Sequence, residues 1–282
     1  MKRTVLLLLL AIAIAAGCSY SRQVHRRSNV MSYLYPKADE APMLNPGGAR
    51  LQLPLKIGIA FVPPESVSGN AYGDWRSIFP AEQERALLEV VKRAFSGKDW
   101  VGRIEVIPST YLTSGGGFAN LDQVARMFNV DVVALASVDQ AQNSNPTEIS
   151  FLYLSIIGAY VLPLDTNETR TMIDVAAFHV PTRTFLLRAP GVSQVKGRST
   201  AVTVAEALGE ASERGFEEAM ADVAKNLDKE VERFRSEVAS GQRADVDIVT
   251  EQGGSVRQGA AAGWPAALAA LAILAIALVR RP

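Results

Sequence analysis

Residues 131–138 read Asp-Val-Val-Ala-Leu-Ala-Ser-Val, an almost unbroken apolar run that is typical of a strand in the interior of a sheet. Residues 55–62, Leu-Lys-Ile-Gly-Ile-Ala-Phe-Val, have the same character, and Pro63 and Pro64 end that run. Such strands are buried on both faces, so we expect helices on both sides of the sheet that contains them.

The segment between these two strands predicts two helices and one further strand. Pro80 suits the first turn of a helix that ends near Gly97. Residues 103–107 predict a short strand, and Asn120 with Gln123 resembles a capping box at the start of a second helix. The resulting order, βαβαβ, favours a sheet that is covered by helices.

Beyond residue 138 the pattern changes to consecutive strands with short connections. These strands are predicted at residues 149–162, 169–180 and 184–189. Strands joined in this way form an antiparallel meander. The polar side chains of Thr169, Thr171 and Asp174 indicate that the middle strand has an exposed face near its start.

A long helix is predicted over residues 200–238. Its apolar residues recur at spacings of 4, 3, 4, 4, 3 and 4, which keeps them on one straight face: Phe216, Met220, Val223, Leu227, Val231, Phe234 and Val238. We expect Gly209 and Gly215 to weaken its first turns. The sequence therefore predicts one α/β domain over residues 54–239, in which a mixed sheet (βαβαβ, then an antiparallel meander) is covered by helices and followed by a long C-terminal helix.

The N-terminus has the parts of an export signal. Lys2 and Arg3 precede an apolar run at residues 5–16, which is too short for a lasting transmembrane helix. Small residues then lead to Cys18, the only cysteine of the chain, which has no partner for an internal disulfide. The pattern resembles a bacterial lipobox, which implies a signal peptide over residues 1–17 and lipidation of Cys18.

The C-terminus has the parts of a second signal. Residues 253–282 contain no acidic residue and begin with Gly253, Gly254 and Ser255. The apolar run at residues 264–279 predicts a transmembrane helix, and the arginines that follow it would stay on the cytoplasmic side.

This tail resembles the GlyGly-CTERM sorting signal, which is recognised by rhombosortase, an intramembrane serine protease of the rhomboid type. With the lipobox, it makes the chain similar to the rhombosortase-target ("rhombotarget") lipoproteins. The resemblance implies that Gly253, Gly254 and Ser255 form the C-terminal processing region, and that the helix resides in the inner membrane only transiently. Ser19, directly after the lipidated cysteine, fits transfer to the outer membrane.

The charge balance argues against nucleic acid as a partner. The chain has 29 basic and 29 acidic residues, and five of the basic residues but none of the acidic ones lie in the two signals. The remainder therefore has a net charge of −5, which is mildly acidic. Residues 18–53, which are rich in proline, predict a tether, and residues 240–252 predict a polar spacer.

Candidate catalytic groups are few. His25 and His179 are the only histidines, and they offer no zinc-binding spacing. The glycines at 115–117 precede a helix, but the loop lacks the Lys and Ser/Thr of a phosphate-binding loop. Paired carboxylates can hydrolyse glycosides, and those near strand ends are Asp139, Asp165 and Asp174. Aromatic residues that could line a surface patch are Tyr72, Trp75 and Trp100. The sequence identifies no catalytic residue, cofactor or metal.

Three functions remain open at this level. The first is an exported lipoprotein of the outer membrane or cell surface, with a non-catalytic domain that binds or assembles with an unidentified envelope protein. Its other partners would be membrane lipid through Cys18, the lipoprotein-processing enzymes and a rhombosortase-type protease. The second is an envelope hydrolase whose catalytic groups meet only in the fold. The third is a lipoprotein that its C-terminal helix anchors permanently.

Overall fold

The computed structural model describes residues 22–37, 48–64, 85, 88–89, 91–93, 98, 100–146, 165–200 and 202–249. The strands are β1 (Arg22–Arg27), β2 (Ala49–Gln52), β3 (Leu55–Phe61), β4 (Val101–Val106), β5 (Val132–Pro146), β6 (Asp165–His179), β7 (Thr184–Ser199) and β8 (Val246–Val249). The helices are α2 (Val30–Leu34), α5 (Gly117–Phe128), α7 (Val204–Ala239) and a 3-10 turn, η1 (Ser109–Tyr111).

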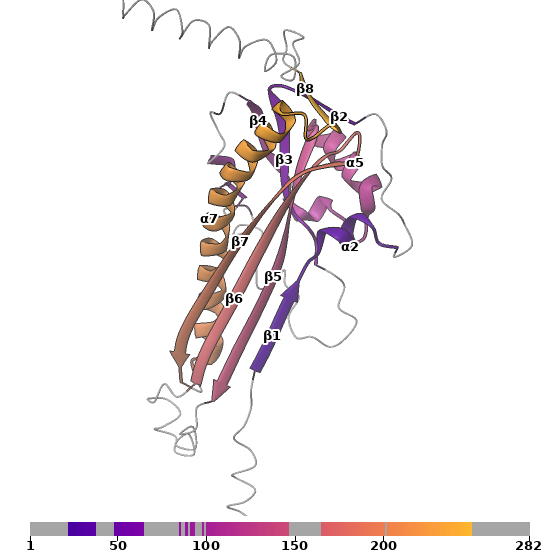
Figure 1. Ribbon diagram of the computed structural model, residues 1–282. Helices are drawn as coiled ribbons and strands as arrows, with labels where there is room; N and C mark the ends of the chain where they lie inside the picture. Colours follow the sequence, from indigo (N-terminus) through magenta and orange to yellow (C-terminus); the bar gives the residue numbers. More distant parts are fainter. Residues whose placement is uncertain are drawn as a thin grey trace, which may run out of the picture.

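The main sheet is mixed, with the strand order β4-β3-β5-β6-β7 (Figure 1). β3 pairs in parallel with β4 and β5, whereas β5, β6 and β7 pair antiparallel. β3 covers only the first residues of β5, and β1 pairs antiparallel with residues 139–144 of the same strand. The predicted fold class is therefore confirmed, and β5 is its central strand.

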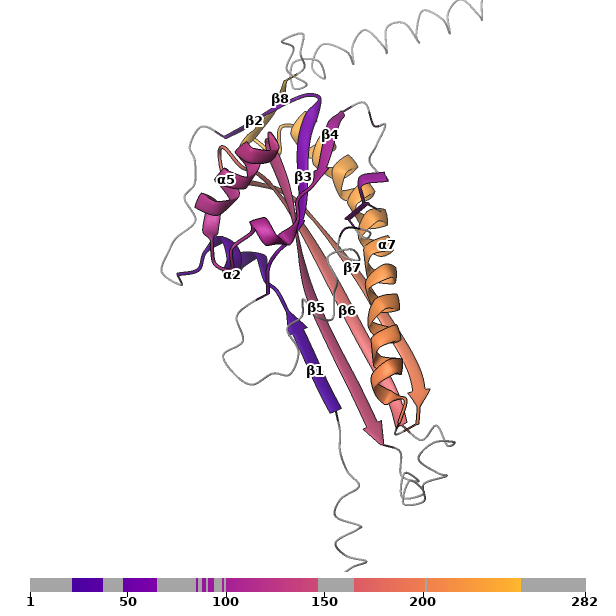
Figure 2. The same ribbon diagram turned by 180° about the vertical axis from the view of Figure 1, so that it is seen from behind.

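Helices cover both faces of the sheet, as the apolar strands require. α7 lies along one face, over β6 and β7, and α2 and α5 lie on the other face near the end that carries β2 and β8 (Figures 1 and 2). Alternate residues of β3 follow this division, because Ile57 and Ile59 face α7 and Ala60 packs with α5. All seven apolar residues of the predicted α7 stripe are buried.

α7 also protects the outer edge of β7. The backbone N–H of Val192 donates to Oδ2 of Asp222 at 3.2 Å, and Nδ2 of Asn226 donates to the carbonyl of Pro190 at 2.8 Å. Between them lies Gly191, where an added Cβ would stand 2.2 Å from the carbonyl oxygen of Ala219. The helix backbone thus contacts the strand directly, and these side chains occupy backbone groups that an edge strand otherwise exposes.

The first half of α7 packs on a buried polar layer rather than an apolar one. The side chain of Gln140 is fully buried; its amide donates to Oγ1 of Thr171 at 2.8 Å, and its carbonyl accepts from Oγ of Ser212 at 2.7 Å. Two residues further along β5, the side-chain amide of Gln142 donates to the backbone carbonyl of Leu208 at 2.6 Å. Hydrogen bonds in this layer satisfy groups whose burial is otherwise costly.

The expectation of an exposed face at Thr169 and Thr171 was wrong. Both threonines are buried against α7 at 0% and 2% exposure, because Gln142 and Gln140 satisfy their hydroxyl groups. Asp174 lies three residues after Thr171 on β6, so its side chain points to the opposite face of the sheet, where it pairs with Arg188. Polar character alone did not distinguish a hydrogen-bonded buried strand face from a solvated one.

Gly215 lies in the contact between α7 and this layer. A Cβ there would stand 2.6 Å from Oγ1 of Thr171, whereas a Cβ at Gly209, in the same helix, would meet nothing within 4 Å. We expect Gly215→Ala to lower the free energy of unfolding by about 1–2 kcal/mol through overpacking. Gly209→Ala is the matched control and should raise it by about 0.5–1 kcal/mol through helix propensity. Urea unfolding measures both, and equal effects would contradict the contact.

Two segments expected to lie outside the fold belong to it. Within the predicted tether, β1 pairs with β5, and β2 pairs in parallel with β8 from the predicted spacer. β2 does carry a period-two signal, since Ala49 and Leu51 are buried and alternate with exposed Arg50 and Gln52. β1 has little apolar pattern because one of its faces is solvated: Gln23, His25 and Arg27 are exposed and only Val24, on the other face, is half-buried.

Some element boundaries differ from those predicted. α5 begins at Gly117, one turn before the predicted capping box. Asn120 caps no helix; instead its Oδ1 accepts from the Tyr33 hydroxyl and from the Thr113 backbone, each at 2.9 Å. β5 and β7 are longer than predicted, because their distal halves carry the polar layer under α7.

Several predictions lie outside the described residues: Cys18, Gly253, Gly254 and Ser255, the helix at 264–279, the strand at 149–162 and most of the helix from Pro80. Arg85, Leu88, Glu89 and residues 91–93 of that last helix are described and helical. Across the segments that the structure does describe, no helix is both long and apolar enough to cross a membrane.

Candidate functional site

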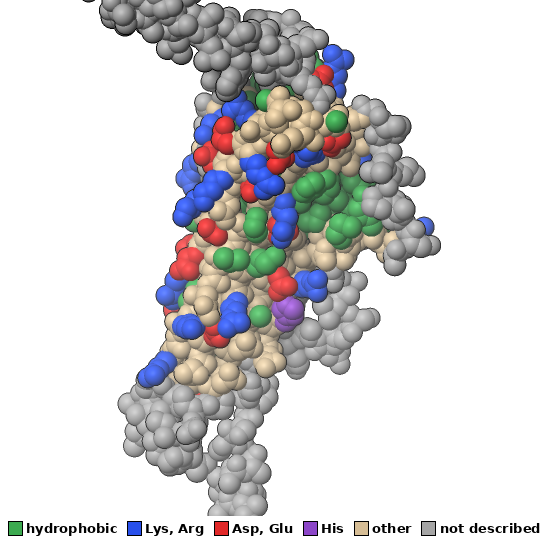
Figure 3. Space-filling view, in the orientation of Figure 1, with side chains coloured by type: hydrophobic (Ala, Val, Ile, Leu, Met, Phe, Trp, Pro, Cys, Tyr) green, Lys and Arg blue, Asp and Glu red, His purple; other side chains and the backbone are tan. Residues whose placement is uncertain are grey.

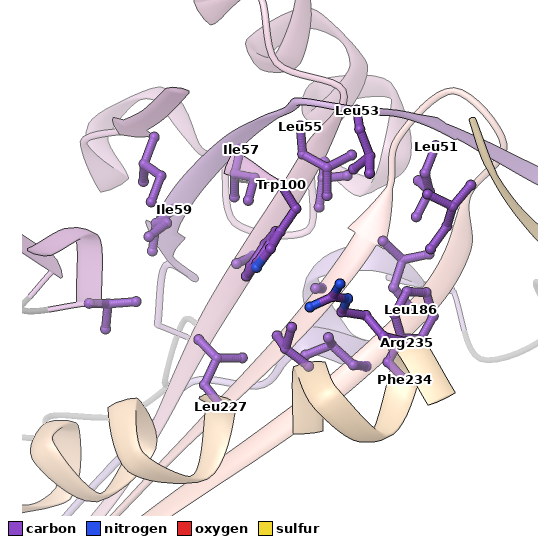
Figure 4. A pocket seen from close by; sticks show the side chains of 18 residues that line it. Leu51, Leu53, Leu55, Ile57, Ile59, Trp100, Leu186, Leu227, Phe234 and Arg235 are labelled. Carbon is purple, nitrogen blue, oxygen red and sulfur yellow. The ribbon is translucent and has the colours of Figure 1, made fainter. Parts of the chain in front are cut away.

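An apolar cavity of about 140 Å³ lies between the C-terminal half of α7 and the sheet (Figure 4). Its described lining comes from seven strands, β2 to β8, from α7 and from the segments around Leu53, Val91 and Trp100. The lining residues are Leu51, Leu53, Leu55, Ile57, Ile59, Val91, Trp100, Ile104, Val132, Ala134, Ala177, Leu186, Leu187, Leu227, Val231, Phe234, Arg235 and Ile248.

Two small residues in the floor explain why space remains there. Ala134 on β5 and Ala177 on β6 are direct cross-strand partners, so their methyl groups lie side by side on the face toward α7. Above them, α7 contributes Leu227 and Val231, one helical turn apart. The short alanine side chains do not reach these residues, and the space between the helix and the strands stays unfilled.

An unfilled space of this size is unusual. Protein interiors pack as densely as organic crystals and contain few voids larger than a water molecule. The cavity, about 140 Å³ in volume, is larger than such voids and opens at its edge, so it can admit a ligand. An apolar occupant would remove this lining from contact with water, which favours its binding.

Arg235 is the charged residue among the described lining residues. Its guanidinium turns toward the space between Trp100 and Leu186 (Figure 4). Nη1 of Arg235 also lies 3.2 Å from Oε1 of Glu232, and both side chains of this pair are more than half exposed. Exposed ion pairs of this kind contribute little stability, so the Arg235 guanidinium can leave Glu232 and bind another anion at little cost.

The second candidate surface is the open face, which is the solvated side of the sheet opposite α7. It is formed by residues 23, 25 and 27 of β1, residues 139, 141 and 143 of β5, and the facing positions of β6 and β7. Nε2 of His25 lies 2.7 Å from Oδ1 of Asp139, and Nε of Arg188 donates to both oxygens of Asp174 at 2.7 and 2.9 Å. Figure 3 shows positive and negative side chains interspersed along this face.

The carboxylates considered as a hydrolytic pair do not form one site. Asp139 and Asp174 are diagonal neighbours on the open face, but each is engaged with its own basic partner. Asp165 begins β6 and lies nine residues from Asp174, which is about 30 Å along an extended strand. Burial raises the pKa of Asp165. Asp139 and Asp174 therefore lie on an open sheet surface, each paired with its own basic side chain, and Asp165 is too far from Asp174 to act with it.

His179 is a buried structural histidine. Its Nδ1 lies 2.7 Å from the hydroxyl of Thr182, which in turn contacts the hydroxyl of Thr184 at 2.8 Å. Burial lowers the pKa of His179, and the carboxylate of Asp131 opposes that shift. The histidine thus supports the turn between β6 and β7.

The lowered pKa of His179 predicts how the stability of the fold changes with pH. The unfolded chain binds a proton at this residue more readily than the folded chain, so His179 lowers stability as the pH falls through the unfolded value of about 6.5. His179→Asn keeps a polar atom near the Nδ1 position but cannot titrate. We expect urea unfolding at pH 7.5 and pH 5 to show a smaller loss of stability in His179→Asn than in the wild type. An unchanged loss would exclude this role.

The glycine loop before α5 has a packing role. Gly115 and Gly117 have φ angles of +66° and +62°, which favour glycine. A Cβ at Gly115 would contact Pro36 at 3.4 Å, and one at Gly117 would lie 3.4 Å from the carbonyl of Leu34. The loop thus brings α5 against the end of α2. Within the described segments, no group of three or more His, Cys, Asp or Glu side chains could hold a metal ion.

Comparison with known proteins leaves the family open. No family model matches the chain, and no curated protein matches it. Among solved structures, a neuraminyllactose-binding hemagglutinin homolog from Helicobacter pylori is 11% identical with a TM-score of 0.36, over 72% of this chain and 95% of that one. A PelC dodecamer from Paraburkholderia phytofirmans is 8% identical with a TM-score of 0.28, over 73% and 98%. Likenesses this low carry no conclusion about function.

Proposed function

We propose that the chain is an exported bacterial envelope lipoprotein whose folded domain is a non-catalytic binding module. In this proposal Cys18 is lipidated, and a rhombosortase-type protease cleaves the chain near Gly253, Gly254 and Ser255. The mature protein is then held at the outer membrane or cell surface by its lipid alone. More than one acyl chain on Cys18 is required for firm anchoring, because a single chain binds a membrane only marginally.

The apolar cavity is the observation that carries the binding part of the proposal. Its described lining offers burial of an apolar group and one guanidinium, and it contains no carboxylate, hydroxyl, thiol or imidazole. Apolar pockets with a few polar groups that fix orientation are the usual form of a small-molecule binding site. The alternative of a hydrolase would need acid–base or nucleophilic groups, and the candidate carboxylates point elsewhere.

The positions of the first and last described strands, β1 and β8, support the anchoring part. β1 begins at Arg22, which pairs with Ser144 near the distal end of β5, whereas β8 lies at the other end of the domain (Figure 1). α7 runs between these ends and is about 54 Å long at 1.5 Å per residue. Cys18 lies four residues before Arg22 in the chain, a reach of at most about 14 Å. A lipid on Cys18 would therefore hold the distal end of the domain at the membrane, with β8, the last described strand, at the far end.

Cys18→Ser tests the anchor directly. In a bacterial host fed a labelled fatty acid, we expect the wild type to carry label and to sediment with membranes. Cys18→Ser should carry no label, because serine lacks the thiol that accepts the lipid. Ser19→Ala is the matched control and should be labelled like the wild type. Label that persists in Cys18→Ser would refute lipidation at this position.

A further inference from the structure

We infer that the cavity binds the acyl chain of a single-chain fatty carboxylate, with Arg235 holding the carboxylate at the cavity mouth. This inference rests on the proposed function, since it names the ligand class of the same binding module. Three features of the described residues carry it: the volume of the cavity, its lining and its charge.

The volume sets the length of the buried group. An apolar cavity of roughly 150 Å³ in another protein stays free of water and binds benzene, a six-carbon ligand. The cavity described here, at about 140 Å³, is nearly the same size. The cavity therefore holds roughly six to eight carbon atoms of a ligand. It is too small for a sterol or a folded peptide segment.

The lining favours an aliphatic chain. Leu55, Ile57 and Ile59 follow one another along the same face of β3, and Leu227 and Val231 follow one another along α7. The β3 row lies beside the alanine floor in the same sheet, and the α7 row lies above that floor. Aliphatic walls have no donor or acceptor to satisfy a polar ligand, so a sugar or nucleotide would lose its hydrogen bonds with water without replacement.

The charge sets the head group. Arg235 is the charged side chain among the described lining residues, and its guanidinium can donate two parallel hydrogen bonds to a carboxylate. Its present partner, Glu232, is one helical turn away on the exposed surface of α7. A ligand carboxylate at the edge of an apolar cavity would be less solvated than Glu232 and would compete well for the same guanidinium.

The test uses the full-length chain in phosphatidylcholine nanodiscs. Substituting Trp75→Phe and Trp264→Phe leaves Trp100, in the cavity lining, as the only tryptophan, so its fluorescence reports on occupancy. Titration with sodium octanoate should give a saturable change in Trp100 emission, and butanoate should give none at the same concentrations. Arg235→Gln should weaken octanoate binding about tenfold while leaving binding of the neutral 1-octanol unchanged.

Ala134→Leu fills the floor and should abolish the response to both octanoate and octanol. It also controls for octanoate that enters the bilayer, because the bilayer is the same in both samples. If circular dichroism shows that Ala134→Leu is unfolded, Ala177→Leu fills the same floor from β6.

An unsaturable response, or one that persists when the floor is filled, would overturn the proposed site. Equal binding of octanoate to the wild type and to Arg235→Gln would overturn the assigned head group. Lipidation of Cys18 plays no part in this assay. Failure here therefore leaves the lipoprotein proposal intact, and an unlipidated Cys18 would leave a positive titration intact.

Discussion

Gly191→Ala should lower the free energy of unfolding by about 3 kcal/mol or more. A Cβ at this position would stand 2.2 Å from the carbonyl oxygen of Ala219 and 2.6 Å from both the backbone nitrogen and Cγ2 of Val223. Two of these three atoms belong to the backbone of α7, so no rotamer change relieves the overlap. α7 would have to move away from β7, and overpacking of this kind reaches the upper end of its usual range of 1–3 kcal/mol.

Gly197→Ala is the matched control in the same strand. A Cβ at Gly197 would meet nothing within 4 Å, and the residue is exposed. We expect this variant to be unchanged or stabilised by up to about 1 kcal/mol, because alanine restricts the unfolded chain. Urea unfolding followed by circular dichroism compares the two. A similar small effect of both substitutions would show that α7 does not contact β7 through Gly191.

Arg243→Ala should have the next largest effect, about 3 kcal/mol. The side chain is largely buried and donates to the backbone carbonyls of Leu186 and Phe185, each at 2.7 Å. It forms two further bonds to the carboxylate of Asp245, both at 2.9 Å, and its guanidinium lies 5.3 Å from the ring centre of Phe234. Arg243 thereby ties the turn after α7 to the start of β7, and hydrogen bonds that involve a charged group stabilise by about 1.5–3 kcal/mol.

Arg233→Ala is the control for Arg243→Ala. Arg233 also forms ion pairs, to Glu230 and Glu237, but its side chain is 68% exposed, so we expect a change below about 0.5 kcal/mol. Arg243 also adds a dependence on pH, because its hydrogen bonds lower the pKa of Asp245. The stabilisation from the pair of Arg243 and Asp245 is fully present above the pKa of an aspartate in the unfolded chain, about 3.9. It is lost as the pH falls through the lower pKa that Asp245 has in the folded protein. The difference in stability between the wild type and Arg243→Ala should therefore narrow once the pH falls below about 3.9, while the part due to the two carbonyl hydrogen bonds remains. A difference that stays constant below that pH would contradict the pairing with Asp245.

The parts of the fold that the sequence predicts best are those with one buried apolar face. The runs at 55–62 and 131–138 form the parallel centre of the sheet, and the α7 stripe is buried as its spacing indicates. The sequence misses β1 and the distal halves of β5 and β7. In these regions the sheet packs through Gln140, Gln142 and the threonines of β6, and a buried polar residue looks like an exposed one until its partner is known.

The cavity could not be predicted for a related reason. Ala134 and Ala177 are ordinary residues of apolar strands, and their effect depends on the register that places them side by side. Arg235 lies next to the apolar stripe of α7, where an arginine more often belongs to a solvated face. For Trp100 the sequence favours core packing or loop anchoring over a surface patch, and neither interpretation places it beside a cavity. Conversely, the signals at Cys18 and at Gly253, Gly254 and Ser255 can be recognised in the sequence but lie outside the described residues.

The intact mass of the mature protein from its native host tests the central claim most directly. We predict a mass that lacks residues 1–17, that carries acyl chains on Cys18 and that ends near Gly253 or Gly254. A mass that retains residues 264–282 would contradict C-terminal processing and would indicate a permanent C-terminal anchor. A mass without acyl chains on Cys18 would contradict the lipoprotein assignment itself.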